Sequence, residues 1–106
     1  KLGPVDWENA SADVSILVGE RDVWGKGVGA EAVYLVGRHL LKEVGLNRIY
    51  ADSRNPAFLR LVEKLGWHVE GVQRERLRVD GRFHDNTLIA LLARDFRPIV
   101  EFEPAG

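Results

Sequence analysis

The sequence predicts an α/β (α+β) fold in which one mixed, twisted sheet combines a central parallel strand pair with two helices and a C-terminal antiparallel hairpin. Three patterns predict it: two-residue alternation near residue 14, apolar residues at helical spacing over 30–44 and 56–65, and an Asp80-Gly81 turn between extended segments. The order strand, helix, strand favours a parallel pair, because the crossover needs a helix-length connection. No linker or repeat divides the 106 residues, so one domain over 1–106 is expected.

The first strand and the first helix follow from hydrophobic periodicity. Val14, Ile16 and Val18 stand at alternate positions, which is typical of a strand with one face more buried than the other. The helix predicted over 30–44 is amphipathic. Its apolar face consists of Val33, Val36, Leu40 and Val44.

The end of this helix and its packing are also readable. Gly45 stands where a left-handed C-terminal cap is needed, and Leu46 is the apolar residue that packs back on such a cap. Gly37 lies near the apolar face, so we expect the helix to approach a sheet closely there.

A second strand over 47–53 and a second helix follow. Asn55 is an N-cap acceptor, and Pro56 occupies the first helical position, where a missing N–H does no harm. Helical spacing then places four apolar residues on one face until Gly66 stops the helix. They are Phe58, Leu61, Val62 and Leu65.

The remaining chain predicts antiparallel structure. Extended segments flank Asp80-Gly81, a two-residue hairpin signal. Asp85 is expected to form a cross-strand ion pair with Arg78 or Arg82. The aromatic residues assigned to the core are Trp7, Trp24, Tyr34, Tyr50 and Trp67.

Composition excludes several classes of function. A formal net charge of −1, from 15 basic and 16 acidic residues, does not predict nucleic-acid or membrane binding. There is no cysteine, no apolar run long enough to span a membrane, and no signal-peptide pattern at residues 1–9, so a cytoplasmic location is expected. His39, His68 and His84 are too scattered in sequence to predict a metal site.

Three alternating glycines, Gly25, Gly27 and Gly29, precede the first helix. Free N–H groups at a helix start favour an anion, and Lys26 adds positive charge, which is the chemistry of a phosphate cradle. A tight turn without any ligand is one alternative. Another is a dinucleotide fold, with Gly25, Gly27 and Ala30 as G-x-G-x-x-A and Asp52 ending the next strand. The absence of Gly-Lys-Ser/Thr excludes a Walker A loop.

Residues 12–96 resemble the C-terminal two-thirds of the GNAT superfamily of N-acetyltransferases, in particular its ribosomal-protein N-terminal acetyltransferase branch. The resemblance rests on "ILVGERDVWGKGVGAEAV", "NPAFLRLVEKLGW" and "EGVQRERLRVDGRFHDNTLIALLARDF", in this order and spacing. It implies that the chain binds acetyl-CoA, with the pyrophosphate on backbone amides of residues 24–30 and Asn55 on the pantetheine arm. The implied cofactor-binding residues are Val18, Gly19, Trp24, Gly25, Lys26, Gly27, Val28, Gly29, Ala30 and Asn55.

Candidate catalytic groups are few. The resemblance places Asp13 where some members carry a glutamate base, and Glu20 lies nearer the expected thioester. For each of them a solvated carboxylate without a catalytic role is the favoured alternative. The tyrosine and the serine that members use as acids are replaced here by Val62 and Phe58.

These observations predict an acetyl-CoA-dependent N-acetyltransferase acting on a primary amine, either a protein N-terminus or a small amine. A coenzyme A-binding or dimerising relative with weak or no turnover is the alternative. The family fold has further elements before the first strand seen here, so that strand would have an exposed edge. We therefore expect a homodimer, with the apolar segment 96–102 contributing to the contact.

Overall fold

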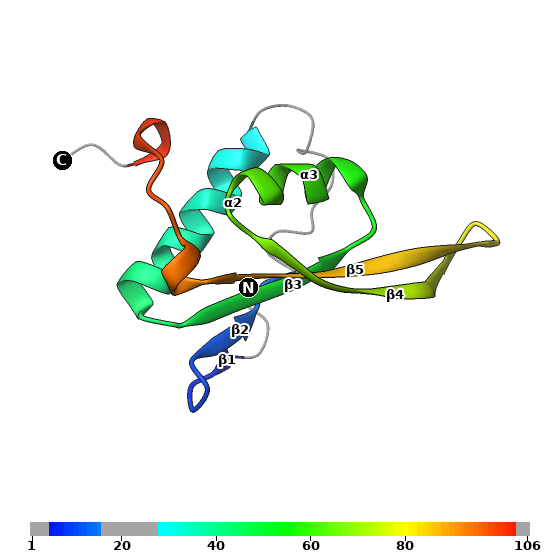
Figure 1. The fold of residues 1–106 in the computed structure, drawn as a ribbon, viewed down its shortest axis with the longest axis horizontal. Coiled ribbons are helices and arrows are strands. Elements are labelled where there is room, and N and C mark those ends of the chain that lie inside the picture. The colour runs from blue at the N-terminus through cyan, green and yellow to red at the C-terminus, as the bar shows by residue number, and fades with distance from the viewer. Residues whose placement is uncertain (1–4, 16–27, 104–106) are drawn as a thin grey trace.

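The computed structural model describes residues 5–15 and 28–103, with the side chain of Val28 outside the description. A five-stranded sheet has the order β1-β2-β3-β5-β4, and helices α2 and α3 lie together on one face of it (Figure 1). The strands are β1 (Val5–Asp6), β2 (Ser11–Asp13), β3 (Arg48–Ser53), β4 (His68–Val79) and β5 (Arg82–Leu92). The helical elements are α2 (Val28–Arg38), the π-helix η1 (His39–Val44), α3 (Pro56–Lys64), η2 (Ala93–Asp95) and η3 (Val100–Phe102).

The sheet confirms the predicted mixture of strand directions. β2 pairs in parallel with β3, whereas β5 pairs antiparallel with both β3 and β4. The first strand lies earlier than its alternation predicts, since β2 ends at Asp13. One further backbone bond follows, in which the Val14 N–H donates to the Tyr50 carbonyl at 2.9 Å. Residues 16–18 lie outside the described part. The expectation of an unpaired outer edge is wrong for β2, since β1 pairs antiparallel with it.

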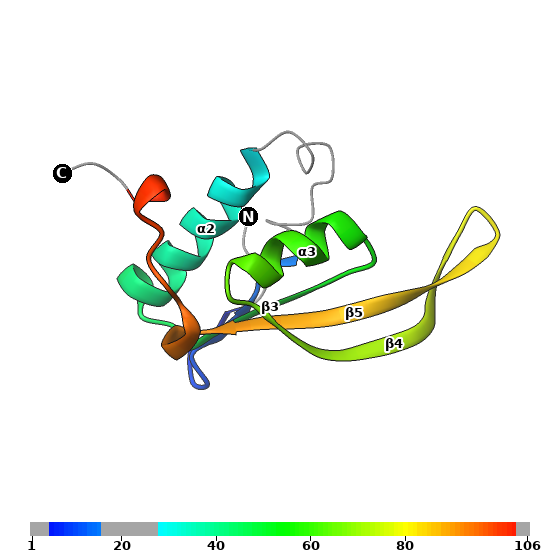
Figure 2. The same cartoon turned by 45° about the horizontal axis from the view of Figure 1, so that its top comes forward.

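Helices α2 and α3 lie over the sheet (Figure 2), and the buried core takes residues from both helices and from the sheet, among them Val33, Phe58 and Ile49. Gly37 is buried, and a Cβ built on it would lie 3.6 Å from Leu91 Cδ2 and 3.7 Å from Ile49 Cδ1. The predicted close approach of α2 to the sheet is therefore confirmed, and it joins β3 and β5 to one helix. The largest fully buried side chains are Val14, Val33, Ile49, Phe58, Val62 and Ile89.

Helix α2 ends in a way that the sequence predicted only in part. Gly45 adopts φ +92° and donates to the Leu40 carbonyl at 3.1 Å, and Leu46 is buried beside it, which confirms the left-handed cap. Val44, predicted on the apolar face, is 38% exposed. The six residues after α2, His39–Val44, form the π-helix η1, and its wider turn rotates Val44 away from the core.

Helix α3 begins as predicted. The side-chain oxygen of Asn55 accepts from the N–H groups of Ala57 at 2.9 Å and Phe58 at 3.4 Å, and Pro56 occupies the first turn. The helix ends at Lys64, and Gly66 follows with φ +98°. Phe58 and Val62 are buried while Leu61 and Leu65 are half-buried, so the predicted apolar face is confirmed with its two outer members partly exposed.

The hairpin of β4 and β5 extends beyond the helices as a long arm (Figure 1). Asp80 and Gly81 have φ of +53° and +77°, as a type I′ turn requires, so the predicted turn is confirmed. The predicted pairing of Asp85 with an arginine is wrong. Its Oδ1 accepts the Glu75 N–H at 2.9 Å, within a register shift that lies between Gln73 and Leu77.

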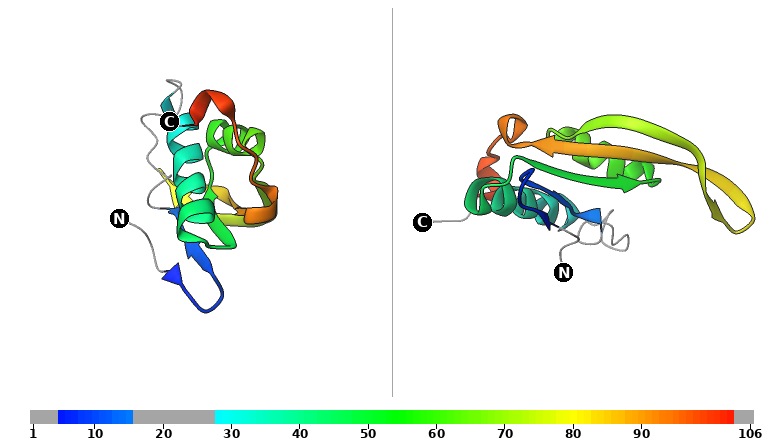
Figure 3. Two further views of the ribbon diagram at one scale, coloured as in Figure 1. Left: turned by 90° about the vertical axis from the view of Figure 1, so that its left-hand side faces the viewer. Right: turned by 90° about the horizontal axis from the view of Figure 1, so that it is seen from below.

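The C-terminal segment 96–103 packs against α2 of the same chain (Figure 3). The Tyr34 ring lies 5.3 Å from that of Phe96 and 5.6 Å from that of Phe102, and the Tyr34 hydroxyl donates to Glu103. The rings of Phe96 and Phe102 are thus used within this chain, and a contact of the segment with a second chain stays a prediction. Tyr34 and Trp67 are buried as predicted and Tyr50 is half-buried, but Trp7 is 69% exposed, and Trp24 lies outside the described residues.

An ion pair and a hydrogen bond also attach segment 96–103 to α2. Arg38 Nε donates to Glu103 at 2.8 Å, and Arg38 also pairs with Glu43 at 2.9 Å. The Tyr34 hydroxyl lowers the pKa of the Glu103 carboxyl, whereas burial, assisted by Glu103, raises the pKa of Tyr34 itself. The C-terminal segment is thus attached to α2 by both packing and charge.

Candidate functional site

The structure covers part of the predicted cofactor site. Asp13, Gly29, Ala30 and Asn55 lie among the described residues, and Val28 does so through its backbone as the first residue of α2. The other predicted site residues lie outside the described part: Val18, Gly19, Glu20, Trp24, Gly25, Lys26 and Gly27. Their assigned roles stay predictions.

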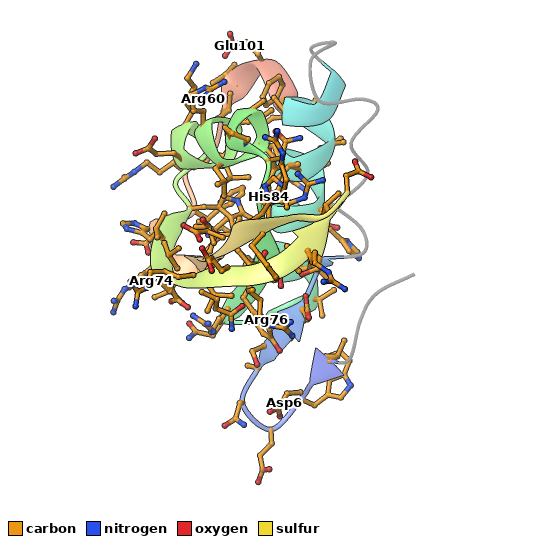
Figure 4. All side chains as sticks on the ribbon, turned by 90° about the vertical axis from the view of Figure 1, so that its right-hand side faces the viewer. Asp6, Arg60, Arg74, Arg76, His84 and Glu101 are labelled. Atoms are coloured by element: carbon orange, nitrogen blue, oxygen red, sulfur yellow. The ribbon has the colours of Figure 1, made fainter. Side chains whose placement is uncertain are left out.

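The start of α2 borders a cavity of about 420 Å³. Ala30 lines it from α2, Arg60 and Lys64 from α3, and Ile99 and Phe102 from the C-terminal segment. Figure 4 shows Arg60 and Glu101 at the same end of the molecule, above the sheet. Most of the lining is apolar, and Ala57, Leu61 and Leu65 complete it. The two cations of α3 and the dipole at the start of α2 both attract negative charge, so they suit the anionic part of a ligand.

A second cavity, of about 400 Å³, lies where β2 and β3 end, and we call it the strand-end cavity. The last described backbone hydrogen bond between these parallel strands runs from the Val14 N–H to the Tyr50 carbonyl. The cavity opens just beyond this point. It is lined by Ser15, Asp52, Ser53, Arg54, Asn55, Pro56, Leu77 and Asn86.

Four polar side chains form one hydrogen-bonded network at this cavity. Ser15 Oγ donates to Asp52 Oδ1 at 3.2 Å, and Asn86 Nδ2 donates to Asp52 Oδ2 at 2.9 Å. Asn86 Nδ2 also donates to Gln73 Oε1 at 3.1 Å. Asn86 is buried, with 5% of its surface exposed, whereas Asp52 is exposed toward solvent. The exposed carboxylate of Asp52 is therefore held in place by the buried side chain of Asn86.

Asp13, the predicted base, lies next to this network. Its Oδ1 accepts the backbone N–H of Ser15 at 2.9 Å, so the carboxylate orders the chain just after β2 and thereby places the Ser15 side chain. A role for Asp13 as a base stays a prediction. Asn55 is similar, because its side-chain oxygen is committed to the N-terminus of α3. Its place on the lining of the strand-end cavity suits a ligand-binding role for the rest of the side chain.

The network contains residues that sequence reasoning missed. Ser15, Gln73 and Asn86 were not singled out as site residues, and Asp52 entered only through the dinucleotide alternative. The sequence carries no clear signal for Asn86, because it stands in the polar first half of β5, and its burial becomes evident only in the structure. The dinucleotide alternative is disfavoured, since β3 has the antiparallel β5 as one neighbour rather than lying within a parallel sheet.

The two positions where family members carry an acidic tyrosine or serine supply no proton donor in this chain. Val62 and Phe58 are buried to within 2% of complete burial and belong to the core. Among residues 5–15 and 28–103, no three His, Asp or Glu side chains are grouped as metal ligands. The described helices are all too short or too polar to cross a membrane.

Comparison with known proteins gives a consistent result. A family model described as "Acetyltransferase (GNAT) domain" matches residues 1–68. The chain is 38% identical over 73 residues to a probable N-acetyltransferase, YjcK, of Bacillus subtilis (strain 168), which covers 67% of this chain and 40% of that protein. It is 32% identical over 76 residues to the [ribosomal protein uS5]-alanine N-acetyltransferase of Escherichia coli (strain K12), covering 70% of this chain and 39% of the relative.

A solved structure shows the same fold. It is a chimera of the spermidine N-acetyltransferase SpeG from Vibrio cholerae with hSSAT, and it superposes with a TM-score of 0.74 at 21% identity. The match covers 88% of this chain and 57% of the other. The present chain thus spans about two-fifths of the two curated relatives named above and somewhat more than half of this structure.

Proposed function

This chain belongs to the GNAT acetyltransferase family, and on that premise we propose that residues 1–106 form an acetyl-CoA-binding domain that acetylates a primary amine. The acceptor is a protein N-terminus or a small amine. The observation that carries the proposal is the placement of two cavities, one between the start of α2 and two cations of α3, and one at the ends of the parallel strands β2 and β3.

The cavity at the start of α2 fits the anionic part of the cofactor. Arg60 and Lys64 supply positive charge, and Gly29 and Ala30 belong to the first turn of α2, whose N–H groups have no partner within the helix. Gly25 and Gly27, predicted just before it, would let phosphate oxygens approach the backbone without meeting a Cβ. This donor set is suited to a pyrophosphate.

Acetyl-CoA supplies a thioester whose acetyl carbon is attacked by the neutral amine, so that a C–N bond forms, the C–S bond breaks, and the leaving thiolate takes up the proton that the amine loses. An alkylammonium with a pKa near 10 is only about 0.1% neutral at pH 7, so its deprotonation is part of the reaction. This chain contributes mainly by holding both reactants, which supplies roughly 7–11 kcal/mol in well-oriented reactions.

Calorimetry with acetyl-CoA, CoA, NAD and ATP tests the binding part of the proposal. We expect saturable heat with the first two ligands only; heat with NAD alone would restore the dinucleotide alternative. A thiol-release assay over a panel of amines then separates an enzyme from a relative that binds coenzyme A without turnover.

Gly27→Val tests the cradle directly. A valine side chain at that glycine should prevent a phosphate from reaching the backbone, so acetyl-CoA binding should be lost while unfolding stays cooperative. Gly71→Val is the matched control, because a Cβ at Gly71 meets nothing within 4 Å and the residue lies in β4, away from the helices. Unchanged affinity of the Gly27→Val protein for acetyl-CoA would contradict the assignment.

A homodimer and a cytoplasmic location remain proposals from the sequence. Light scattering across a range of protein concentrations tests the first. A monomer at all concentrations, with acetyl-CoA bound, would remove the dimer from the proposal.

A further inference from the structure

We propose that Asp52 binds the ammonium group of the amine acceptor in the strand-end cavity, with Ser15 and Asn86 as positioning residues. The inference rests on the proposed function and names the acceptor chemistry of that site, an alkylammonium cation.

The carboxylate of Asp52 is held in one orientation from two strands. Ser15, just after β2, donates to Oδ1, and Asn86 of β5 donates to Oδ2. The Asp52 N–H donates into Ser15 Oγ at 3.3 Å, so the single hydroxyl proton of Ser15 is left to point at Asp52. A carboxylate fixed in this way needs little reorganisation to receive a cation.

The orientation of Asn86 is fixed as well. Its Nδ2 atom has two protons, and its two acceptors, Asp52 Oδ2 and Gln73 Oε1, match that number. Because Asn86 is almost fully buried, its amide is a firm support beneath the exposed Asp52. This arrangement leaves the charge of Asp52 at the surface of the cavity.

The donors around Asp52 are neutral, so they orient its negative charge without cancelling it. Three other described carboxylates are paired with arginine, Glu43 and Glu103 with Arg38 and Glu70 with Arg48, whereas Asp52, like Asp13 and Asp85, accepts from uncharged donors. An ionised carboxylate has about four lone-pair sites, and Ser15 and Asn86 use two of them. An ammonium group brings three donors and a full positive charge, so it complements what remains.

Arg54 also lines the cavity and must be considered. Within the part of the chain that the structure describes, it makes no ion pair with Asp52. The cavity is therefore lined by a guanidinium and a carboxylate that do not neutralise each other. A small monocation is expected at Asp52, and a dianion such as a pyrophosphate is not.

The two faces of the sheet separate the two reactants. Alternation along β3 places Ile49 and Ala51 against the core beneath the helices, and Asp52 on the opposite face. Helix α2, whose first turn is predicted to continue the phosphate cradle, lies on the opposite, helical face (Figure 2). The acceptor would thus approach from the face opposite the helices and meet the cofactor where β2 and β3 end.

Amine binding can be measured without turnover. In ¹⁵N-labelled protein saturated with CoA, n-butylamine at constant ionic strength should shift the side-chain NH₂ resonances of Asn86, and n-butanol should not. Asp52→Asn should weaken n-butylamine binding by at least about fivefold, as expected for one partly exposed charge-assisted hydrogen bond. Asp80→Asn is the matched control: it also removes one carboxylate, at the hairpin tip, where asparagine tolerates the positive φ.

Kinetics separates a binding role from a structural one. In the thiol-release assay Asp52→Asn should raise KM for the amine more than it lowers kcat, and Asp52→Glu, which keeps the charge, should recover part of the loss. Asn86 resonances that do not move with n-butylamine, or equal affinity of wild type and a folded Asp52→Asn protein, would overturn the inference while acetyl-CoA binding still stood. Loss of acetyl-CoA binding in the wild type would instead reject the proposed function.

Discussion

The hydroxyl of Tyr34 joins helix α2 to the C-terminal segment, and Tyr34→Phe removes only that group. The hydroxyl donates to Glu103 and accepts the Ile99 N–H at 3.0 Å, while the ring packs against Phe96 and Phe102. The phenylalanine ring keeps the packing. The change in the free energy of unfolding therefore reports the hydroxyl alone.

The expected loss follows from the groups left without a partner. Tyr34 is 3% exposed and Ile99 is half-buried, so water replaces the lost bonds poorly. Leaving such a donor unpaired costs about 1–3 kcal/mol, and we expect about 2 kcal/mol here. For a domain of this size that corresponds to a fall in Tm of about 8–16 °C.

Urea unfolding, followed by the fluorescence of the buried Trp67, measures this loss. Tyr50→Phe is the matched control: Tyr50 is half-buried, and its ring keeps its contact with the Arg48 guanidinium, 5.2 Å from the ring centre. The control should change stability by less than about 0.5 kcal/mol. If Tyr34→Phe is no less stable than Tyr50→Phe, the hydroxyl bonds to Glu103 and Ile99 contribute nothing and the reasoning is refuted.

Two further predictions concern backbone strain and acid. Gly66→Ala should lower the free energy of unfolding, measured in urea, more than Gly45→Ala does. Both residues have positive φ, which costs alanine about 1–2 kcal/mol, but only at Gly66 would the new Cβ also lie 3.1 Å from a carbonyl oxygen, that of Asp95. Equal losses of stability in the two variants would contradict this. Hydrogen bonds from Tyr34 and Arg48 lower the pKa of Glu103 and Glu70 in the folded state, so their contribution is present above the unfolded pKa of about 4.3 and lost as the pH falls through the lower folded values. The urea midpoint should thus fall between pH 5 and pH 3, and an unchanged midpoint would show that these bonds do not contribute.

Local signals in the sequence predicted local structure well. The cap at Gly45, the N-cap at Asn55 and the turn at Asp80-Gly81 each depend on a conformation or a hydrogen bond within a few residues. Such features are determined before any tertiary contact forms. The mixed sheet was predictable for a related reason, because connection length limits which strand pairs can be parallel.

Features that depend on distant contacts were not predictable. The π-helical turn that exposes Val44, the bulge that gives Asp85 a backbone partner and the exposure of Trp7 follow from packing and register. The network at the strand-end cavity is of this kind as well. Asp52 and Asn86 are 34 residues apart, and only the register between β3 and β5 brings them together.

The placement of β5 between β3 and β4 affects when this chain can fold during synthesis. β3 pairs with β5 over six residues but with β2 over only three, and in the described sheet β4 has no neighbour but β5. On the ribosome, neither strand can complete its hydrogen bonds until residue 92 has left the exit tunnel. Shorter nascent chains expose unpaired strand edges, so they are the species for which a chaperone would be needed.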